Sequence, residues 1–100
     1  MSNEFEIINA FKEWEDARTR KANADIDVRE KTNELKVKKA RIISYRGTTL
    51  GKNAELREAR LLEECLPEEM ALIAALNEQT MAACDAEILL TRLELLREAD

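Results

Sequence analysis

The sequence contains no histidine, and this absence removes several kinds of chemistry. Histidine is the usual general base near neutral pH, the usual nitrogen ligand of zinc, and a ligand in the di-iron sites of helical bundles. The chain also lacks a Gly-rich phosphate-binding loop with its following lysine. We therefore expect a protein that is not an enzyme and holds no metal or other cofactor.

Glycine and proline are almost as rare, because 100 residues contain two glycines and one proline. Proline breaks helix interiors, and glycine is the usual residue of tight turns. The chain is rich instead in Ala, Leu, Glu, Lys and Arg, and 37% of it is charged. This composition is typical of long helices and coiled coils. We expect a single helical domain covering residues 1–100, without a β-sheet or a deep pocket.

Long apolar runs are also missing. No stretch approaches the roughly 20 residues that a transmembrane helix needs, and residues 1–4 lack the features of a signal peptide. A soluble cytoplasmic protein is expected, with no membrane contact. Cys65 and Cys84 are then expected to be reduced, buried thiols rather than a disulfide or reactive nucleophiles.

Residues 3–46 contain neither glycine nor proline and are expected to form one long helix. Apolar residues recur in this segment at heptad spacing, which predicts a coiled-coil seam. Lys21, Lys31 and Lys38 interrupt the seam, and poor helix formers at residues 23–27 leave the continuity of the helix open. The expected seam residues are Ile7, Ala10, Trp14, Ala17, Ala24, Val28, Leu35, Ile42 and Tyr45.

The chain is expected to turn at residues 47–51, because Gly47 and Gly51 bound a short polar stretch in which Leu50 points inward. Asn53 is a typical N-cap and predicts a second helix at about residues 54–65. Pro67 is tolerated only in a first helical turn, so a third helix is expected at about residues 68–98. The predicted fold is all-α, a long antiparallel helical hairpin with coiled-coil-like packing.

Charge supports this hairpin. Residues 1–46 carry eleven basic and nine acidic side chains, whereas residues 47–100 carry five basic and twelve acidic ones. A fold-back brings the basic group before the turn against the acidic group after it. Arg57 is also expected to reach a carboxylate across the hairpin. The basic group is Lys36, Lys38, Lys39, Arg41 and Arg46, and the acidic group is Glu55, Glu58, Glu63, Glu64, Glu68 and Glu69.

The last helix is too apolar for a single neighbour. Its apolar residues cover more than one stripe, whereas a two-helix hairpin buries only one face. A second apolar contact is expected, with another copy of the chain or with a different protein. The residues concerned are Met70, Ile73, Leu76, Met81, Ala83, Ile88, Leu90, Leu93, Leu95 and Leu96.

Aromatic, acidic and leucine side chains are the candidate protein contacts. Phe11 and Trp14 either close the open end of the hairpin or anchor a partner. Adjacent glutamates such as Glu63 and Glu64 diverge by about 100° on a helix and cannot share one metal ion. The candidate protein-interaction residues are Phe11, Trp14, Glu63, Glu64, Glu68, Glu69, Leu89, Leu93 and Leu96.

Two further sets of residues are singled out. Lys36, Lys38, Lys39 and Arg41 are candidate nucleic-acid contacts, although pairing with the acidic group is the preferred interpretation. The residues expected to shape turns and caps are Gly47, Gly51, Asn53, Arg57 and Pro67.

The segment from Tyr45-Arg46-Gly47 through Gly51-Lys52-Asn53-Ala54-Glu55-Leu56-Arg57-Glu58-Ala59 to the end Arg92-Leu93-Glu94-Leu95-Leu96-Arg97 resembles small helical proteins of tailed bacteriophages. The resemblance covers about residues 45–98. Those coiled-coil-like proteins are mostly of unknown function, and some lie among recombination or replication genes. The resemblance implies a viral origin and the bacterial host cytoplasm, rather than an activity.

Three functions are compatible with these features. The first is a non-enzymatic, phage-type protein-interaction module, a small oligomeric adaptor or regulator. The second is an inhibitor of a host defence system or nuclease, anti-CRISPR-like or an acidic DNA mimic, acting through residues 55–69. The third is a recombination-associated nucleic-acid-binding accessory protein. No small-molecule substrate is expected.

Overall fold

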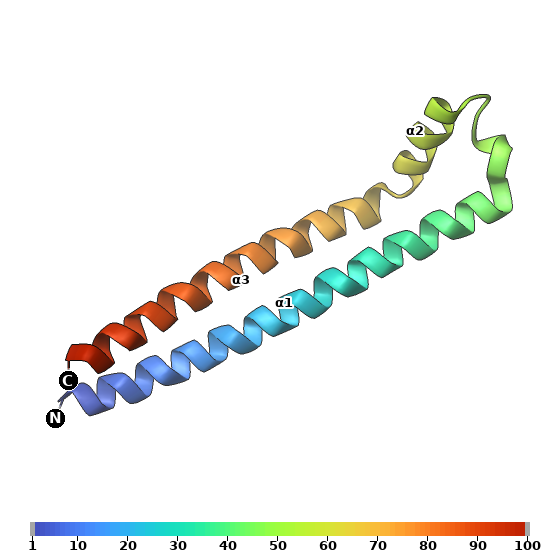
Figure 1. Ribbon diagram of the computed structural model, residues 1–100. Coiled ribbons are helices and arrows are strands. Elements are labelled where there is room, and N and C mark those ends of the chain that lie inside the picture. Colours follow the sequence, from blue (N-terminus) through green and yellow to red (C-terminus); the bar gives the residue numbers. More distant parts are fainter. Residues whose placement is uncertain (1, 100) are drawn as a thin grey trace. The chain divides into compact units, whose positions relative to one another are not determined.

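The computed structural model describes residues 2–99, apart from the side chains of Ser2, Asn3 and Thr48. Helix α1 spans Ser2–Arg46, the 3-10 helix η1 spans Gly47–Leu50, helix α2 spans Ala54–Glu64 and helix α3 spans Leu66–Ala99 (Figure 1). Within these residues no strand is present. Helices α1 and α3 pack against each other as an antiparallel hairpin, so the predicted fold class is confirmed.

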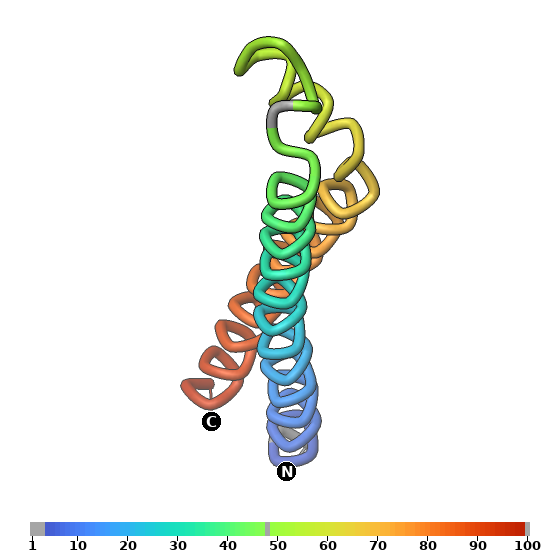
Figure 2. Tube along the Cα trace, turned by 90° about the vertical axis from the view of Figure 1, so that its right-hand side faces the viewer, coloured from blue at the N-terminus to red at the C-terminus, as the bar shows by residue number. Residues whose placement is uncertain are grey.

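The chain divides into two compact units. The terminal unit comprises residues 1–26 and 76–100, and the loop unit comprises residues 27–75. In the terminal unit, the first half of α1 lies beside the second half of α3, and the start of α1 and the end of α3 lie at the same end (Figures 1 and 2). The loop unit contains the rest of α1, then η1, α2 and the first turns of α3.

Small residues form the contact between α1 and α3 in the terminal unit. Because alanine has no side chain beyond Cβ, two helices that meet through alanines can approach closely. The heptad spacing that predicted this seam is therefore confirmed over α1, where Ile7 and Trp14 are half-buried beside the alanines. The buried residues of the seam are Ala10, Ala17, Ala24, Ala82, Ala86 and Leu93.

The turn in the loop unit depends on both glycines. Gly47 has a φ of 42°, a left-handed conformation that L side chains rarely adopt. A Cβ at Gly51 would lie 2.8 Å from Cγ of Leu56, which is closer than van der Waals contact allows. Leu50, which lies between the two glycines in the sequence, is buried as predicted, and Cys65 is buried as well.

The predicted helix boundaries are confirmed to within two residues. The Oδ1 atom of Asn53 accepts a 2.8 Å hydrogen bond from the Leu56 amide, so Asn53 caps α2. Pro67 is the second residue of α3, where a missing amide hydrogen costs no helical hydrogen bond. Helix α1 is continuous through residues 23–27, the segment in which a break was considered.

Three sequence predictions are wrong. Tyr45 is 83% exposed rather than in the seam, because it lies in the last turn of α1, next to the point where the chain turns away. Cys84 is exposed, since it is two residues from both Ala82 and Ala86 and therefore points away from the seam. Arg57 donates to the carbonyl of Gly51 at 3.4 Å, within the turn, instead of to a carboxylate across the hairpin.

Within residues 2–99, none of the helices combines the length and apolar character that a membrane span needs.

Candidate protein-interaction surface

The basic and acidic groups that flank the turn meet in the loop unit, as their charges predicted. The Nζ atom of Lys38 lies 2.8 Å from Oε1 of Glu68, and that of Lys39 lies 3.0 Å from Oε1 of Glu69. Arg46 pairs with Glu64. For the remaining members of the two groups, no ion pair with another described side chain is present. These members are Lys36, Arg41, Glu55, Glu58 and Glu63.

Lys38 and Glu68 pair with each other at seam positions, and this pairing shifts the pKa of both groups. The hydrogen bond raises the pKa of Lys38 and lowers the pKa of Glu68, because each charge is stabilised by the other. The second carboxylate oxygen of Glu68 is buried and has no hydrogen-bond partner. Burial raises the pKa of the neighbouring Cys65 thiol, so this thiol is poorly suited to nucleophilic chemistry.

The terminal unit has a second set of ion pairs. Arg20 on α1 donates to Glu78 at 2.6 Å and to Asp85 at 2.7 Å, both on α3. Arg92 on α3 donates to Glu13 on α1 at 3.0 Å. The hydrogen bond from Arg20 lowers the pKa of Glu78. Sequence reasoning missed these pairs, although their positions flank the seam, where coiled coils place interhelical ion pairs.

The aromatic group lies on α1 in the terminal unit. The rings of Phe11 and Trp14 have centroids 5.7 Å apart, and the Arg18 guanidinium lies 5.0 Å from the centroid of the Trp14 ring. Trp14 is half-buried in the seam, whereas Phe11 is exposed. The structure therefore places Trp14 at the hairpin contact, with Phe11 at its edge.

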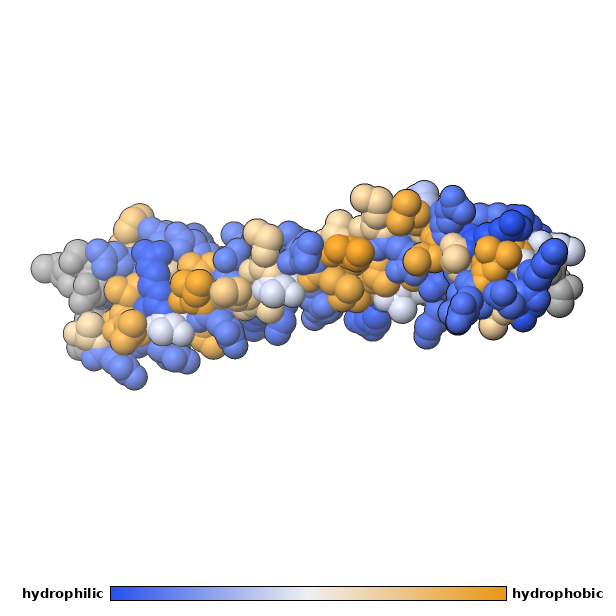
Figure 3. Space-filling view, turned by 90° about the horizontal axis from the view of Figure 1, so that it is seen from above, coloured by the Kyte–Doolittle hydropathy of each residue, from blue (hydrophilic) through white to orange (hydrophobic). Residues whose placement is uncertain are grey.

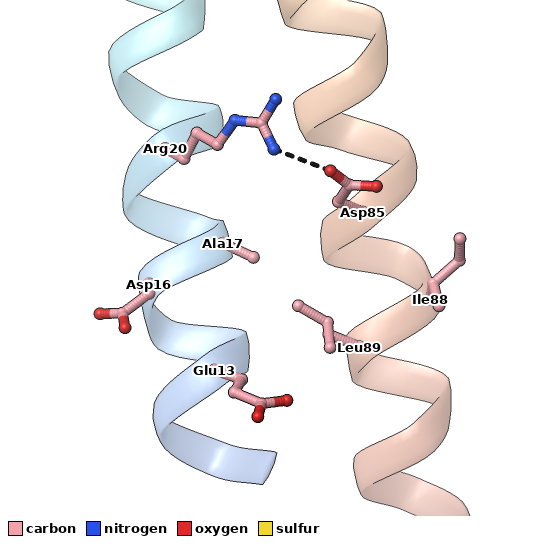
Figure 4. A pocket seen from close by; sticks show the side chains of 7 residues that line it. All are labelled: Glu13, Asp16, Ala17, Arg20, Asp85, Ile88 and Leu89. Atoms are coloured by element: carbon pink, nitrogen blue, oxygen red, sulfur yellow. Dashed lines mark hydrogen bonds and ion pairs between the residues drawn. The ribbon is translucent and has the colours of Figure 1, made fainter. Parts of the chain in front are cut away.

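The three predicted interaction leucines are on the α1-facing side of α3. Leu93 is 3% exposed, and Leu89 and Leu96 are half-buried. In Figure 4, Leu89 points toward α1 whereas Ile88 points away from it. These leucines contribute to the hairpin contact rather than to a free face of α3.

The free face of α3 carries different apolar residues. Met81, Ile88 and Leu95 follow one another at seven-residue spacing and are 58%, 59% and 61% exposed. Exposed Cys84 lies between them. We call these four residues the outer stripe. Figure 3 shows hydrophobic side chains among charged ones on the face of the molecule that is seen from above. The second apolar face predicted for the last helix is therefore present.

A shallow hollow lies on each side of the outer stripe. One, of about 520 Å³, has Ile88 at its edge and is crossed by the ion pair of Arg20 and Asp85 (Figure 4). Its lining is Glu13, Asp16, Ala17, Arg20, Asp85, Ile88 and Leu89. The other, of about 610 Å³, is lined by Lys21, Asp25, Gln79, Thr80, Ala83, Cys84 and Glu87. An apolar stripe with polar margins is typical of a protein contact surface.

Residues 2–99 contain no group of side chains that could hold a metal ion. No cluster of three or more Cys, Asp or Glu residues has a suitable arrangement there. The exposed apolar face of α3 is the candidate site. Comparisons of the chain with family models, curated proteins and solved structures found no match.

Proposed function

We propose that this protein is a non-enzymatic interaction module, a small helical adaptor or regulator that presents the outer stripe of α3 to an apolar helix of another polypeptide. The observation that carries this proposal is the exposure of Met81, Ile88 and Leu95 at heptad spacing on a helix whose opposite face already packs against α1.

Burial of this face supplies a large part of the free energy that binding needs. Covering a large apolar side chain contributes about 1.5–3 kcal/mol, so three such side chains can offset much of the entropic cost of association. Seven-residue spacing also restricts the partner, because a helix presents apolar residues at the same interval. The module is therefore suited to helix recognition rather than to a flat or extended partner.

We further propose that this module acts in the bacterial host cytoplasm, the location that the resemblance to small phage proteins implies. The two alternative functions have less support. Glu64, Glu68 and Glu69 pair with basic residues of the same unit, so fewer acidic side chains are available to imitate nucleic-acid phosphates. The same pairs occupy Lys38 and Lys39, which reduces the basic surface available to nucleic acid.

A quantitative co-purification from bacterial cells tests the proposal. Tagged full-length protein should retain a bound polypeptide, either another protein or an untagged copy of the chain. Ile88→Glu should abolish that retention, because a charge would enter the apolar contact. Ile8→Glu is the matched control, since Ile8 is similarly exposed, at 53%, but lies on α1. Equal retention by wild type and Ile88→Glu would show that the outer stripe is not the binding surface.

A further inference from the structure

The outer stripe has the spacing of one side of a coiled coil. Met81, Ile88 and Leu95 occupy one heptad position, which we label a. Asn77, Cys84 and Thr91 occupy the companion position d, three residues after position a in each heptad. These six residues run over 77–95, roughly 28 Å of helix at 1.5 Å per residue.

Charged residues flank the stripe on both sides. Glu78, Asp85 and Arg92 occupy position e, on the margin that also pairs with α1. Thr80, Glu87 and Glu94 occupy position g on the opposite margin. In a coiled coil, the pairing of e and g residues sets the direction and register of the two helices.

A second copy of α3 fits this stripe when the two helices are parallel and in register. Each g residue then faces the partner's e residue five positions further along, so Glu87 faces the partner's Arg92. Symmetry repeats this attraction on the other side. Arg92 also pairs with Glu13, but its side chain is 56% exposed and a guanidinium has five N–H donors, so it can bridge two carboxylates.

Antiparallel pairing brings like charges together and gives no net attraction. In the register that aligns Ile88 with the partner's Cys84, Glu87 faces the partner's Glu87 and Asp85 faces the partner's Asp85, while Glu78 faces the partner's Arg92, so repulsion and attraction offset each other. A shift of one heptad in one direction brings Glu87 against the partner's Glu94 and Asp85 against the partner's Arg92. A shift in the other direction brings Glu78 against the partner's Asp85. In the parallel register the only charged e–g pairs are the two attractions between Glu87 and Arg92, so the charge pattern favours the parallel arrangement.

We propose that the outer stripe binds the outer stripe of a second copy, forming a symmetric, parallel dimer. This dimer rests on the proposed function, and in it the partner of the outer stripe is a second copy of the chain. In this dimer each a or d residue meets its own counterpart. Asn77 therefore meets the partner's Asn77, and Cys84 meets the partner's Cys84.

Sedimentation velocity of the reduced full-length chain tests the dimer. Wild type should sediment as a dimer at micromolar concentration. Ile88→Glu should raise the dissociation constant by more than about tenfold, because two buried isoleucines are lost from each dimer. Ile8→Glu should sediment as wild type does. Circular dichroism must show the same helix content in all three proteins. A monomeric wild type would overturn the proposal, as would a dimer unaffected by Ile88→Glu.

Oxidation with copper phenanthroline tests the parallel register. Cys65→Ala, which retains Cys84 alone, should form a disulfide-linked dimer, whereas Cys84→Ala should not, since Cys65 is buried. Adding Thr91→Cys to Cys84→Ala and Cys65→Ala should restore the cross-link, because residue 91 meets its own counterpart only in the parallel register. A cross-link through Cys84 without one through residue 91 would contradict that register.

These experiments also distinguish a second copy of the chain from another protein as the partner of the outer stripe. The terminal unit contains twelve acidic and six basic residues, so a basic amphipathic helix of another protein is the competing occupant. If wild type is monomeric yet retains another protein in an Ile88-dependent manner, the dimer is wrong and the proposed function stands. If Ile88→Glu changes neither dimerisation nor retention, both proposals are wrong.

Discussion

In the loop unit, Lys38 of α1 donates a 2.8 Å hydrogen bond to Glu68 of α3. This pair stands at a seam position, where a coiled coil usually has an apolar residue. A paired charge at such a position tolerates few alternative alignments, because any shift of the helices leaves a partly buried charge without its partner. The pair therefore contributes to the register of the hairpin.

The stability that this pair supplies should depend on pH. The pKa of Glu68 is lowered from an ordinary value of 4.5, so its contribution is complete above that value and is lost as the pH falls through the folded-state pKa. The pKa of Lys38 is raised from 10.5, so its contribution is complete below that value and is lost at higher pH. Glu68→Gln should therefore lower the urea midpoint at neutral pH.

The difference in urea midpoint between wild type and Glu68→Gln should shrink as the pH falls through the lowered folded-state pKa of Glu68, because the carboxylate then becomes protonated. Glu63→Gln is the control, because Glu63 has no ion-pair partner among the described side chains. A difference that stays constant from neutral to acid pH would mean that the ion pair does not contribute to stability.

The alanine seam should be sensitive to added volume. Ala24→Leu introduces a large side chain at a buried position and should destabilise the protein by about 1–3 kcal/mol through overpacking. Ala22→Leu makes the same change two residues away, at an exposed position, and should leave the free energy of unfolding nearly unchanged. Urea unfolding followed by circular dichroism measures both. Equal effects would show that the helices do not meet closely at Ala24.

The N-cap of α2 should contribute measurably to stability. Asn53→Ala removes the acceptor of the Leu56 amide hydrogen and should cost about 1 kcal/mol. Asn33→Ala changes the same residue type inside α1 and should instead stabilise slightly, because alanine has the higher helix propensity. Thermal unfolding of the two variants should therefore shift in opposite directions. A shift in the same direction would contradict the capping role.

Leu93 and Leu95 should behave differently despite their proximity. Leu93→Ala removes a buried side chain from the hairpin and should destabilise it by about 2–5 kcal/mol. Leu95→Ala should have little effect on unfolding of the monomer, because Leu95 is exposed on the outer stripe. It should weaken the dimer instead. Unfolding at low protein concentration measures the effect on the monomer, and sedimentation at high concentration measures the effect on the dimer. If Leu95→Ala destabilised the monomer and Leu93→Ala weakened the dimer instead, the assignment of the two faces of α3 would be wrong.

Much of the fold follows from local physical chemistry that the sequence contains. The absence of glycine and proline over residues 3–46 predicts one helix, and Gly47, Asn53 and Pro67 mark where helices end or begin. These effects act over a single helical turn and need no knowledge of the rest of the chain. The opposite charges that flank the turn likewise predict the pairs made by Lys38 and Lys39.

Only the tertiary structure decides which face of α3 is used in the hairpin. The sequence of α3 contains two apolar stripes with the same seven-residue spacing, and periodicity alone cannot assign one of them to α1. Packing against the α1 alanines selects the stripe of Ala82 and Leu93, since small residues on both helices permit the closer approach. That selection leaves Cys84 and Ile88 exposed, and the candidate interaction surface results from it.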